Sequence, residues 1–161
     1  MDEFEKFYNK ALKFLSYRPR SEDEVRKNLL NSRGRFKSAK RNTTPEIAEK
    51  IIAKLKEYKF INDEEFVRWW VEQRTNFKPR SLRLIKMELK QKGITTELID
   101  SVIHNSEFKI QNDLELAKKL IEKRLNKYKS LPREEKFQKI ARYLSSKGFN
   151  YDIIKEIFKE I

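Results

Sequence analysis

The sequence predicts an all-α protein that consists of three tandem three-helix repeats in an elongated, curved array. Its three glycines, Gly34, Gly93 and Gly148, are spaced so that each ends the same helix of a repeated unit. Three of the four prolines precede these glycines by 14 to 16 residues. These prolines are Pro19, Pro79 and Pro132. Because proline can begin a helix and glycine commonly ends one, the spacing indicates one helix repeated three times.

The first unit is predicted over residues 1–61. Its first helix shows apolar residues at an i, i+3, i+4 spacing, which predicts one buried face. A capping box that starts at Ser21 predicts a second helix near Ser21–Arg33. Thr44, followed by proline, predicts the start of the third helix. The apolar residues that the third helix is expected to bury are Ile47, Ile51, Ile52, Leu55 and Tyr58.

The second unit is predicted over residues 62–106 with the same three helices. Asn62 and the acidic residues after it predict the N-terminal cap of the first helix. The second helix is expected near Ser81–Lys92, and the third is expected to begin at Thr95 or Thr96. Nothing in this stretch has the alternating pattern of a half-buried strand.

The third unit, residues 107–161, has its second helix predicted near Arg133–Lys147. The first unit differs from the others by a basic loop insertion at residues 33–43. We expect Arg33–Asn42 to be mobile in the free protein, because Phe36 is its only large apolar residue and little offsets the ordering entropy.

Composition points to a polyanionic partner. The chain has 38 Lys and Arg residues against 25 Asp and Glu residues, a formal net charge of +13. Such an excess is typical of proteins that bind nucleic acid, anionic membranes or strongly acidic proteins. No apolar run exceeds three residues, so we expect no membrane-spanning segment and a cytoplasmic protein. Lysines that merely solvate helix faces are the alternative explanation, which the local clustering of the charge disfavours.

Catalytic and metal-binding functions find little support in the sequence. Cysteine is absent and His104 is the only histidine, so neither a thiol nucleophile nor a histidine cluster is available. The three glycines lie more than 50 residues apart, which excludes a glycine-rich phosphate loop. We therefore expect a non-enzymatic protein without a cofactor or metal.

The sequence resembles the RecX family of RecA regulators along nearly its whole length. The residues that carry the resemblance fall in three blocks: Ala11-Leu12 and Leu15 with Arg18-Pro19-Arg20-Ser21-Glu22 and Glu24-Val25; Phe60-Ile61-Asn62-Asp63-Glu64-Glu65-Phe66; and Lys78-Pro79-Arg80-Ser81 with Ile85, Leu89 and Lys92-Gly93-Ile94. Phe77-Lys78-Pro79 stands where the family usually has a glycine. The resemblance implies three three-helix repeats that bind in the groove of the RecA–DNA filament and inhibit recombinase activity, with roles in DNA repair and the SOS response.

Ten basic residues are predicted to form a diffuse surface that contacts the RecA filament or DNA. They come from the first-unit loop and from the start and body of the second helix of unit two. The ten are Arg33, Arg35, Lys37, Lys40, Arg41, Lys78, Arg80, Arg83, Lys86 and Lys90. We expect the protein to act as a monomer, because no long apolar stripe is left over.

Two other kinds of partner remain open from the residues. The chain could be a sequence-independent nucleic-acid-binding helical repeat without a recombinase partner, or a cationic scaffold for an acidic protein. Base reading by a helix-turn-helix is disfavoured, because the third helix of unit two carries Glu97 and Asp100 and no Lys or Arg. For base stacking, Trp69 and Trp70 are expected in a core or interface, whereas Phe36 is the better candidate.

Overall fold

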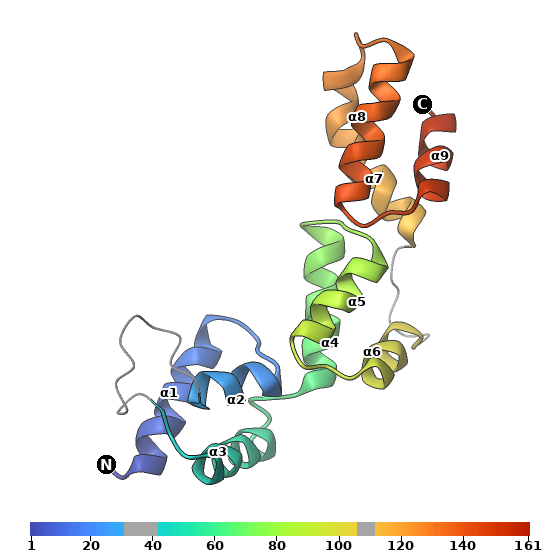
Figure 1. The fold of residues 1–161 in the computed structure, drawn as a ribbon. Helices are drawn as coiled ribbons and strands as arrows, with labels where there is room; N and C mark the ends of the chain where they lie inside the picture. Colours follow the sequence, from blue (N-terminus) through green and yellow to red (C-terminus); the bar gives the residue numbers. More distant parts are fainter. Residues whose placement is uncertain (31–41, 106–111) are drawn as a thin grey trace.

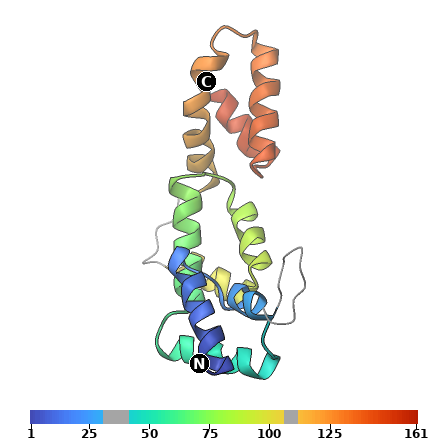
Figure 2. The same ribbon diagram turned by 90° about the vertical axis from the view of Figure 1, so that its left-hand side faces the viewer.

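A computed structural model describes residues 1–30, 42–105 and 112–161, and all regular secondary structure within these ranges is α-helical. The helices of the three units are α1 Glu3–Tyr17, α2 Glu22–Leu30 and α3 Pro45–Glu57; α4 Asp63–Asn76, α5 Leu82–Gln91 and α6 Thr96–Ile103; and α7 Asp113–Tyr128, α8 Arg133–Ser146 and α9 Tyr151–Lys159. Each helix packs mainly on the other two of its own unit. The units follow one another in an elongated, bent row (Figures 1 and 2). The predicted fold class is therefore confirmed.

Local signals at the helix ends act as the sequence indicated. Ser21 and Glu24 form a reciprocal capping box, in which the Glu24 N–H donates to Ser21 Oγ at 3.1 Å and the Ser21 N–H donates to Glu24 Oε2 at 3.0 Å. The side chains of Asn62 and Thr95 accept from backbone N–H groups in the first turns of α4 and α6. Helices α5 and α8 end one residue before the predicted ends. The predicted end of α2, Arg33, lies outside the described residues.

Each unit has its own apolar core, which explains why the molecule is a row and not a single bundle. Separate buried clusters lie around Leu29 and Ile51 in the first unit, Phe66 and Ile85 in the second, and Ile140 in the third. One prediction of burial was wrong. Tyr58 is 60% exposed because α3 ends at Glu57 and Tyr58 is its C-cap, where the chain leaves the core face.

Neighbouring units are joined by a contact that repeats at both junctions. At the first junction, Ser21 Oγ donates to the Lys92 carbonyl at 2.7 Å, and the Glu22 N–H donates to Asp63 Oδ1 at 2.9 Å. The second junction has the same plan, although here the backbone N–H of the serine is the donor. The N–H groups of Ser81 and Leu82 donate to the Lys147 carbonyl and to Asp113 Oδ1, at 3.0 and 2.8 Å. The start of α2 or α5 is thus held by the next unit.

The glycines at these junctions are needed for close approach as well as for ending a helix. Gly93 and Gly148 have φ values of 78° and 86°, a left-handed conformation that favours glycine. A Cβ on Gly93 would lie 2.3 Å from Asp23 Cβ, and one on Gly148 would lie 2.4 Å from Ser81 Oγ. Gly34 lies outside the described residues. The repeated glycine therefore has a packing role at each described junction.

The contacts between units do not define the residue at which one unit ends and the next begins. The boundary between residues 61 and 62 falls between α3 and α4, whereas the one between 106 and 107 lies outside the described residues. The predicted unit ranges remain predictions.

Candidate nucleic-acid interface

The structure describes half of the predicted basic contact residues. The five cations of the first-unit insertion lie outside the described residues, and so does Phe36. The predicted mobility of this loop concerns the same residues. These cations are Arg33, Arg35, Lys37, Lys40 and Arg41. The other five, Lys78, Arg80, Arg83, Lys86 and Lys90, lie at the α4–α5 corner and along α5.

Helix α5 separates these five residues onto two sides. Arg80, just before the helix, contacts Glu88, which also accepts from Arg74 on α4. Lys86 pairs instead with Asp100 on α6, and its neighbours in the helical repeat, Arg83 and Lys90, share that flank. We call Arg83, Lys86 and Lys90 the α5 row. The cations that looked like one patch in the sequence therefore lie on different sides of unit two.

Glu88 is the centre of a half-buried polar cluster that holds α5 against α4. The Trp70 Nε1–H and the Arg74 Nε–H donate to Glu88 Oε2 at 2.9 and 3.1 Å, and Arg80 Nη1 donates to Glu88 Oε1. The Arg74 guanidinium also lies 4.3 Å from the centre of the Trp70 ring. Arg80 is only 18% exposed, so part of its role is to fix the start of α5.

The members of the α5 row differ in how free their charges are. Lys86 Nζ lies 3.0 Å from Asp100 Oδ1, and this hydrogen bond lowers the pKa of Asp100. Arg83 Nη2 donates to the Gly148 carbonyl of the third unit at 3.5 Å. Lys90 and, at the corner, Lys78 are exposed and have no ion-pair partner among the described residues. Lys78 and Lys90 are thus the most available cations of the predicted set in this part of the chain.

Trp69 and Trp70 lie at the first junction and not on an open stacking surface. Trp70 is 7% exposed, and its ring packs with those of Phe66 and Trp69. The Arg18 guanidinium of the first unit lies 5.9 and 5.8 Å from the centres of the Trp69 and Trp70 rings. The prediction of a core or interface position for the pair is confirmed.

A row of lysines on α7 continues the basic surface into the third unit. Lys119, Lys123 and Lys127 are four residues apart and so line one flank of the helix. Lys119 Nζ donates to the carbonyl of Thr75, in the last turn of α4, at 3.4 Å. This bond places the lysine row directly after the α4–α5 corner.

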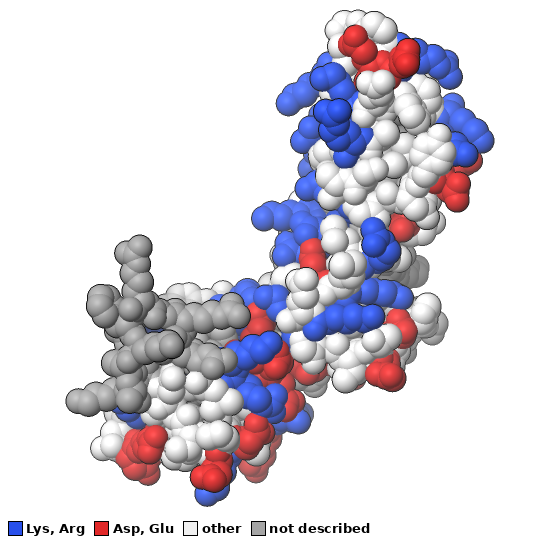
Figure 3. Space-filling view, viewed as in Figure 1, with Lys and Arg blue, Asp and Glu red and all other residues white. Residues whose placement is uncertain are grey.

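The cations that follow this path form what we call the basic stripe: Arg18, Arg74, Lys78, Lys119, Lys123 and Lys127. It begins at the first junction with Arg18, crosses Trp70 to Arg74, passes the α4–α5 corner and ascends α7. Figure 3 shows Lys and Arg gathered over α7 and α8, on the left-hand side of the third unit, and continuing onto the second. Arg18 and Arg74 are paired with Glu24 and Glu88, so the stripe is most cationic in its α7 part.

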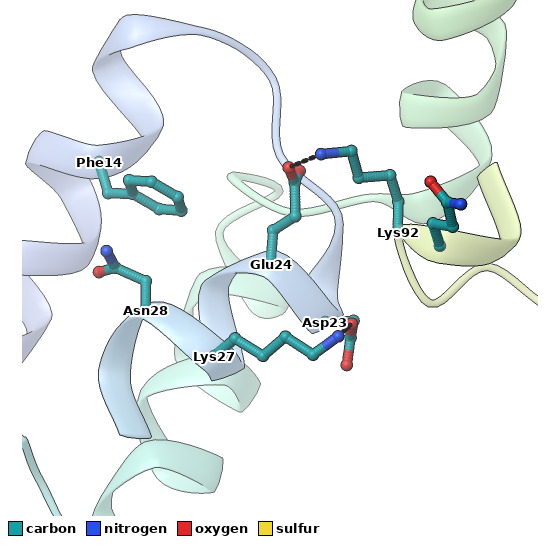
Figure 4. A pocket seen from close by; sticks show the side chains of 7 residues that line it. Phe14, Asp23, Glu24, Lys27, Asn28 and Lys92 are labelled. Atoms are coloured by element: carbon teal, nitrogen blue, oxygen red, sulfur yellow. Dashed lines mark ion pairs between the residues drawn. The ribbon is translucent and has the colours of Figure 1, made fainter. Parts of the chain in front are cut away.

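The cleft between the first two units is neutralised by its own charges. It has a volume of about 420 Å³ and lies between α1, α2 and the end of α5 (Figure 4). Lys92 Nζ lies 3.1 Å from Glu24 Oε1, and Lys27 Nζ lies 2.6 Å from Asp23 Oδ2. Burial would raise the pKa of Glu24, but hydrogen bonds from Arg18, the Ser21 N–H and Lys92 together lower it. This arrangement is suited to joining two units, not to holding a charged ligand.

Two further observations concern sites that the sequence made improbable. Over residues 1–30, 42–105 and 112–161, no three His, Asp or Glu side chains are grouped so that they could hold a metal ion. In the same ranges, no helix combines the length and apolarity that crossing a bilayer requires.

Family models match the three units in order. Residues 8–31, 62–103 and 111–158 match the models described as the first, second and third three-helix domains of RecX. The chain belongs to the RecX family. The RecX three-helix domains thus account for most of its length. Helices α4 to α8 fall within the second and third matches, and α9 does so except for its last residue.

Individual RecX proteins are similar over nearly the whole chain. The proteins named regulatory protein RecX from Bacillus subtilis and Bacillus licheniformis are 33% and 34% identical, over 99% of this chain and 56% of their own length. The chain therefore spans about half the length of these relatives. The crystal structure of RecX from Lactobacillus salivarius is similar with a TM-score of 0.72 at 29% identity, over 98% of this chain and 95% of that one. These relatives are named as regulatory proteins, not as enzymes.

Some surface features were absent from the predicted contact set. The lysine row of α7 is detectable from its four-residue spacing, but the predicted contact set contains no residue of the third unit. Tyr17 and Phe77, which are 71% and 69% exposed, are also outside the predicted contact set. Their shared signal is an aromatic residue followed by a cation and a Pro-Arg pair, present in the first two units.

Proposed function

We propose that this chain is a non-catalytic modulator that inhibits RecA recombinase by binding the RecA–DNA filament through its basic surface. Membership in a family of regulatory proteins supports a regulatory role. The observation that carries the proposal is the basic stripe, which runs from the first junction across unit two and along α7. Such a surface suits a long polyanion better than a compact ligand.

The mechanism follows from the shape of the molecule. A row of three units, held at each junction by hydrogen bonds to the next unit, can contact an extended partner at several points at once. Laid along the groove of a nucleoprotein filament, it would bridge neighbouring subunits. Bridging would restrict the rearrangement that accompanies ATP hydrolysis, which is the proposed cause of inhibition.

The proposed contact set keeps all ten predicted cations and adds the α7 row. Lys78 and Lys90 are exposed and are the first choice for phosphate contacts. Arg80 is a weaker choice because it is also paired with Glu88 and helps to fix the start of α5. The protein is proposed to act as a monomer in the cytoplasm, in DNA repair and the SOS response, with single- or double-stranded DNA contacted independently of sequence.

The test is the ATPase activity of RecA on single-stranded DNA, titrated with the protein and with three matched double variants. The first, Lys78→Glu with Lys123→Glu, reverses the stripe, and the second, Arg83→Glu with Lys90→Glu, reverses the α5 row. Lys86 is left unchanged because its reversal would face Asp100. The control, Lys50→Glu with Lys155→Glu, makes the same charge change on α3 and α9.

We expect the stripe variant to raise the half-inhibitory concentration at least about tenfold, a loss of about 1.4 kcal/mol. The α5-row variant should have a smaller effect, and the control should remain within about twofold of the unmodified protein. Equal inhibition by all three variants would contradict a role for the basic surface.

A sequence-independent nucleic-acid-binding repeat without a recombinase partner is the second candidate, favoured by the same charge pattern. It is distinguished by the titration itself, because such a protein would bind DNA but leave the ATPase unchanged wherever DNA is in excess. It would also not be recovered with purified RecA in the absence of DNA.

A further inference from the structure

Two exposed aromatic rings occupy the same place in successive units. Tyr17 is the last residue of α1, and Phe77 is the C-cap of α4, so each lies at the corner between the first and second helices of its unit. Their exposed fractions are 71% and 69%. Each ring is followed by a cation, a proline and an arginine. Burial does not explain these rings, because neither belongs to the core cluster of its unit.

Lysines are close to both rings in the sequence, and one more approaches the chain next to Phe77 from the third unit. Lys13 is exposed on α1 one turn before Tyr17, so the two side chains share a flank of the helix. Phe77 is adjacent in sequence to Lys78, and the carbonyl of Thr75, two residues before it, accepts from Lys119. An exposed ring with neighbouring lysines is the arrangement that proteins use to stack a nucleobase and neutralise its phosphate.

The two rings lie along the basic stripe and not at random places on the surface. Arg18, next to Tyr17, lies over Trp70. Phe77 follows Trp70 by seven positions along α4 and its C-cap, which is about 10 Å along the helix axis. Among the described residues, the other strongly exposed aromatic residues are Tyr58 and Phe60, which follow α3, and Tyr151, which begins α9. None of the three has an exposed aromatic counterpart in the described part of another unit.

We propose that Tyr17 and Phe77 are stacking positions for the bases of single-stranded DNA, with Lys13, Lys78 and Lys119 contacting the adjacent phosphates. This goes beyond the proposed function because the isolated chain binds the strand directly, without RecA; only the choice of DNA over RNA rests on that function. Stacking uses the face of any base, so the contact is independent of sequence but requires unpaired bases.

The test is binding of the isolated protein to fluorescently labelled oligothymidylate, about 20 nucleotides long, measured by anisotropy. The comparison ligands are an abasic strand of equal length, a duplex of the same length and the matching oligouridylate. The test variant is Tyr17→Ala with Phe77→Ala. The control is Tyr58→Ala with Tyr151→Ala, which removes two rings that are similarly exposed, at 60% and 59%. Tyr17→Phe with Phe77→Trp keeps aromatic faces and should restore binding.

We expect the test variant to lose at least about fivefold in affinity per ring for oligothymidylate. It should bind the abasic strand and the duplex as the unmodified protein does, with an unchanged thermal melt. Unchanged oligothymidylate binding, or an equal loss on the abasic strand, overturns the proposal. Tighter binding of oligouridylate overturns the assignment to DNA.

A variant that loses RecA binding but keeps oligothymidylate binding assigns the rings to a protein partner instead, and this also overturns the proposal. Failure of the proposed function is a separate result. In that case the basic-surface variants leave RecA ATPase inhibition unchanged, whatever the rings do with the isolated strand.

Discussion

Replacement of Gly93 by alanine is expected to weaken the first junction. At φ 78°, the alanine would be in the left-handed conformation, which costs about 1–2 kcal/mol. Its Cβ would also lie 2.3 Å from Asp23 Cβ. Because Asp23 Cβ is attached directly to the backbone of α2, it cannot rotate away, so the two units must separate.

Separation removes two hydrogen bonds, from Ser21 Oγ to the Lys92 carbonyl and from the Glu22 N–H to Asp63, at about 1 kcal/mol each. The expected total loss is about 3–4 kcal/mol. For a chain of this size, that lowers the thermal midpoint by about 6–16 °C.

The assay is thermal unfolding followed by circular dichroism and by tryptophan fluorescence. Trp69 and Trp70 report on the junction because Arg18 of the first unit lies over both rings. Their emission should shift toward that of water-exposed indole before the helices melt. Adding Asp23→Gly removes the clashing Cβ and should recover part of the loss, less about 1 kcal/mol for a glycine inside a helix. A wild-type melting curve and emission spectrum for Gly93→Ala would refute the reasoning.

Four further predictions concern the charges. Glu88→Ala leaves Arg74, Arg80 and the Trp70 N–H without their acceptor. It should lower the free energy of unfolding, measured with denaturant, by about 2–4 kcal/mol, and Glu88→Gln should lower it less. Equal losses for the two variants would contradict the role of the cluster. Burial raises the pKa of Asp63, so ionisation of this carboxyl reduces stability as the pH rises through that pKa. The variant Asp63→Asn should therefore have a higher thermal midpoint than the unmodified protein at pH 7, and the difference should disappear near pH 3. For Glu24, whose pKa is lowered despite its burial, the contribution to stability is present above the ordinary carboxyl pKa and disappears as the pH falls, so Glu24→Gln should destabilise at pH 7 but not near pH 3. For DNA binding, about five neutralised phosphates give a slope of log affinity against log salt of roughly −3.5 to −4.5, and a slope near zero would exclude phosphate contacts.

The sequence by itself determined the helices, the repeat and the net charge. These properties depend on local chemistry, because an N-cap, a proline or a glycine acts on backbone groups within about one turn. The boundaries of α5 and α8 were therefore predictable within one residue. The burial predicted for Tyr58 was wrong because apolar periodicity does not show at which residue a helix ends, and the residues after that end no longer face the core.

Only the tertiary structure decided which cations act together. Lys86 and Arg80 are close in sequence, but pairing with Asp100 on one side and Glu88 on the other divides them between two faces of α5. Ser21 and Lys92 are joined although 71 residues apart, and Lys119 continues the stripe because it bonds to Thr75 of the preceding unit. Such contacts depend on how whole units dock, and a local pattern carries no information about the partner across the junction.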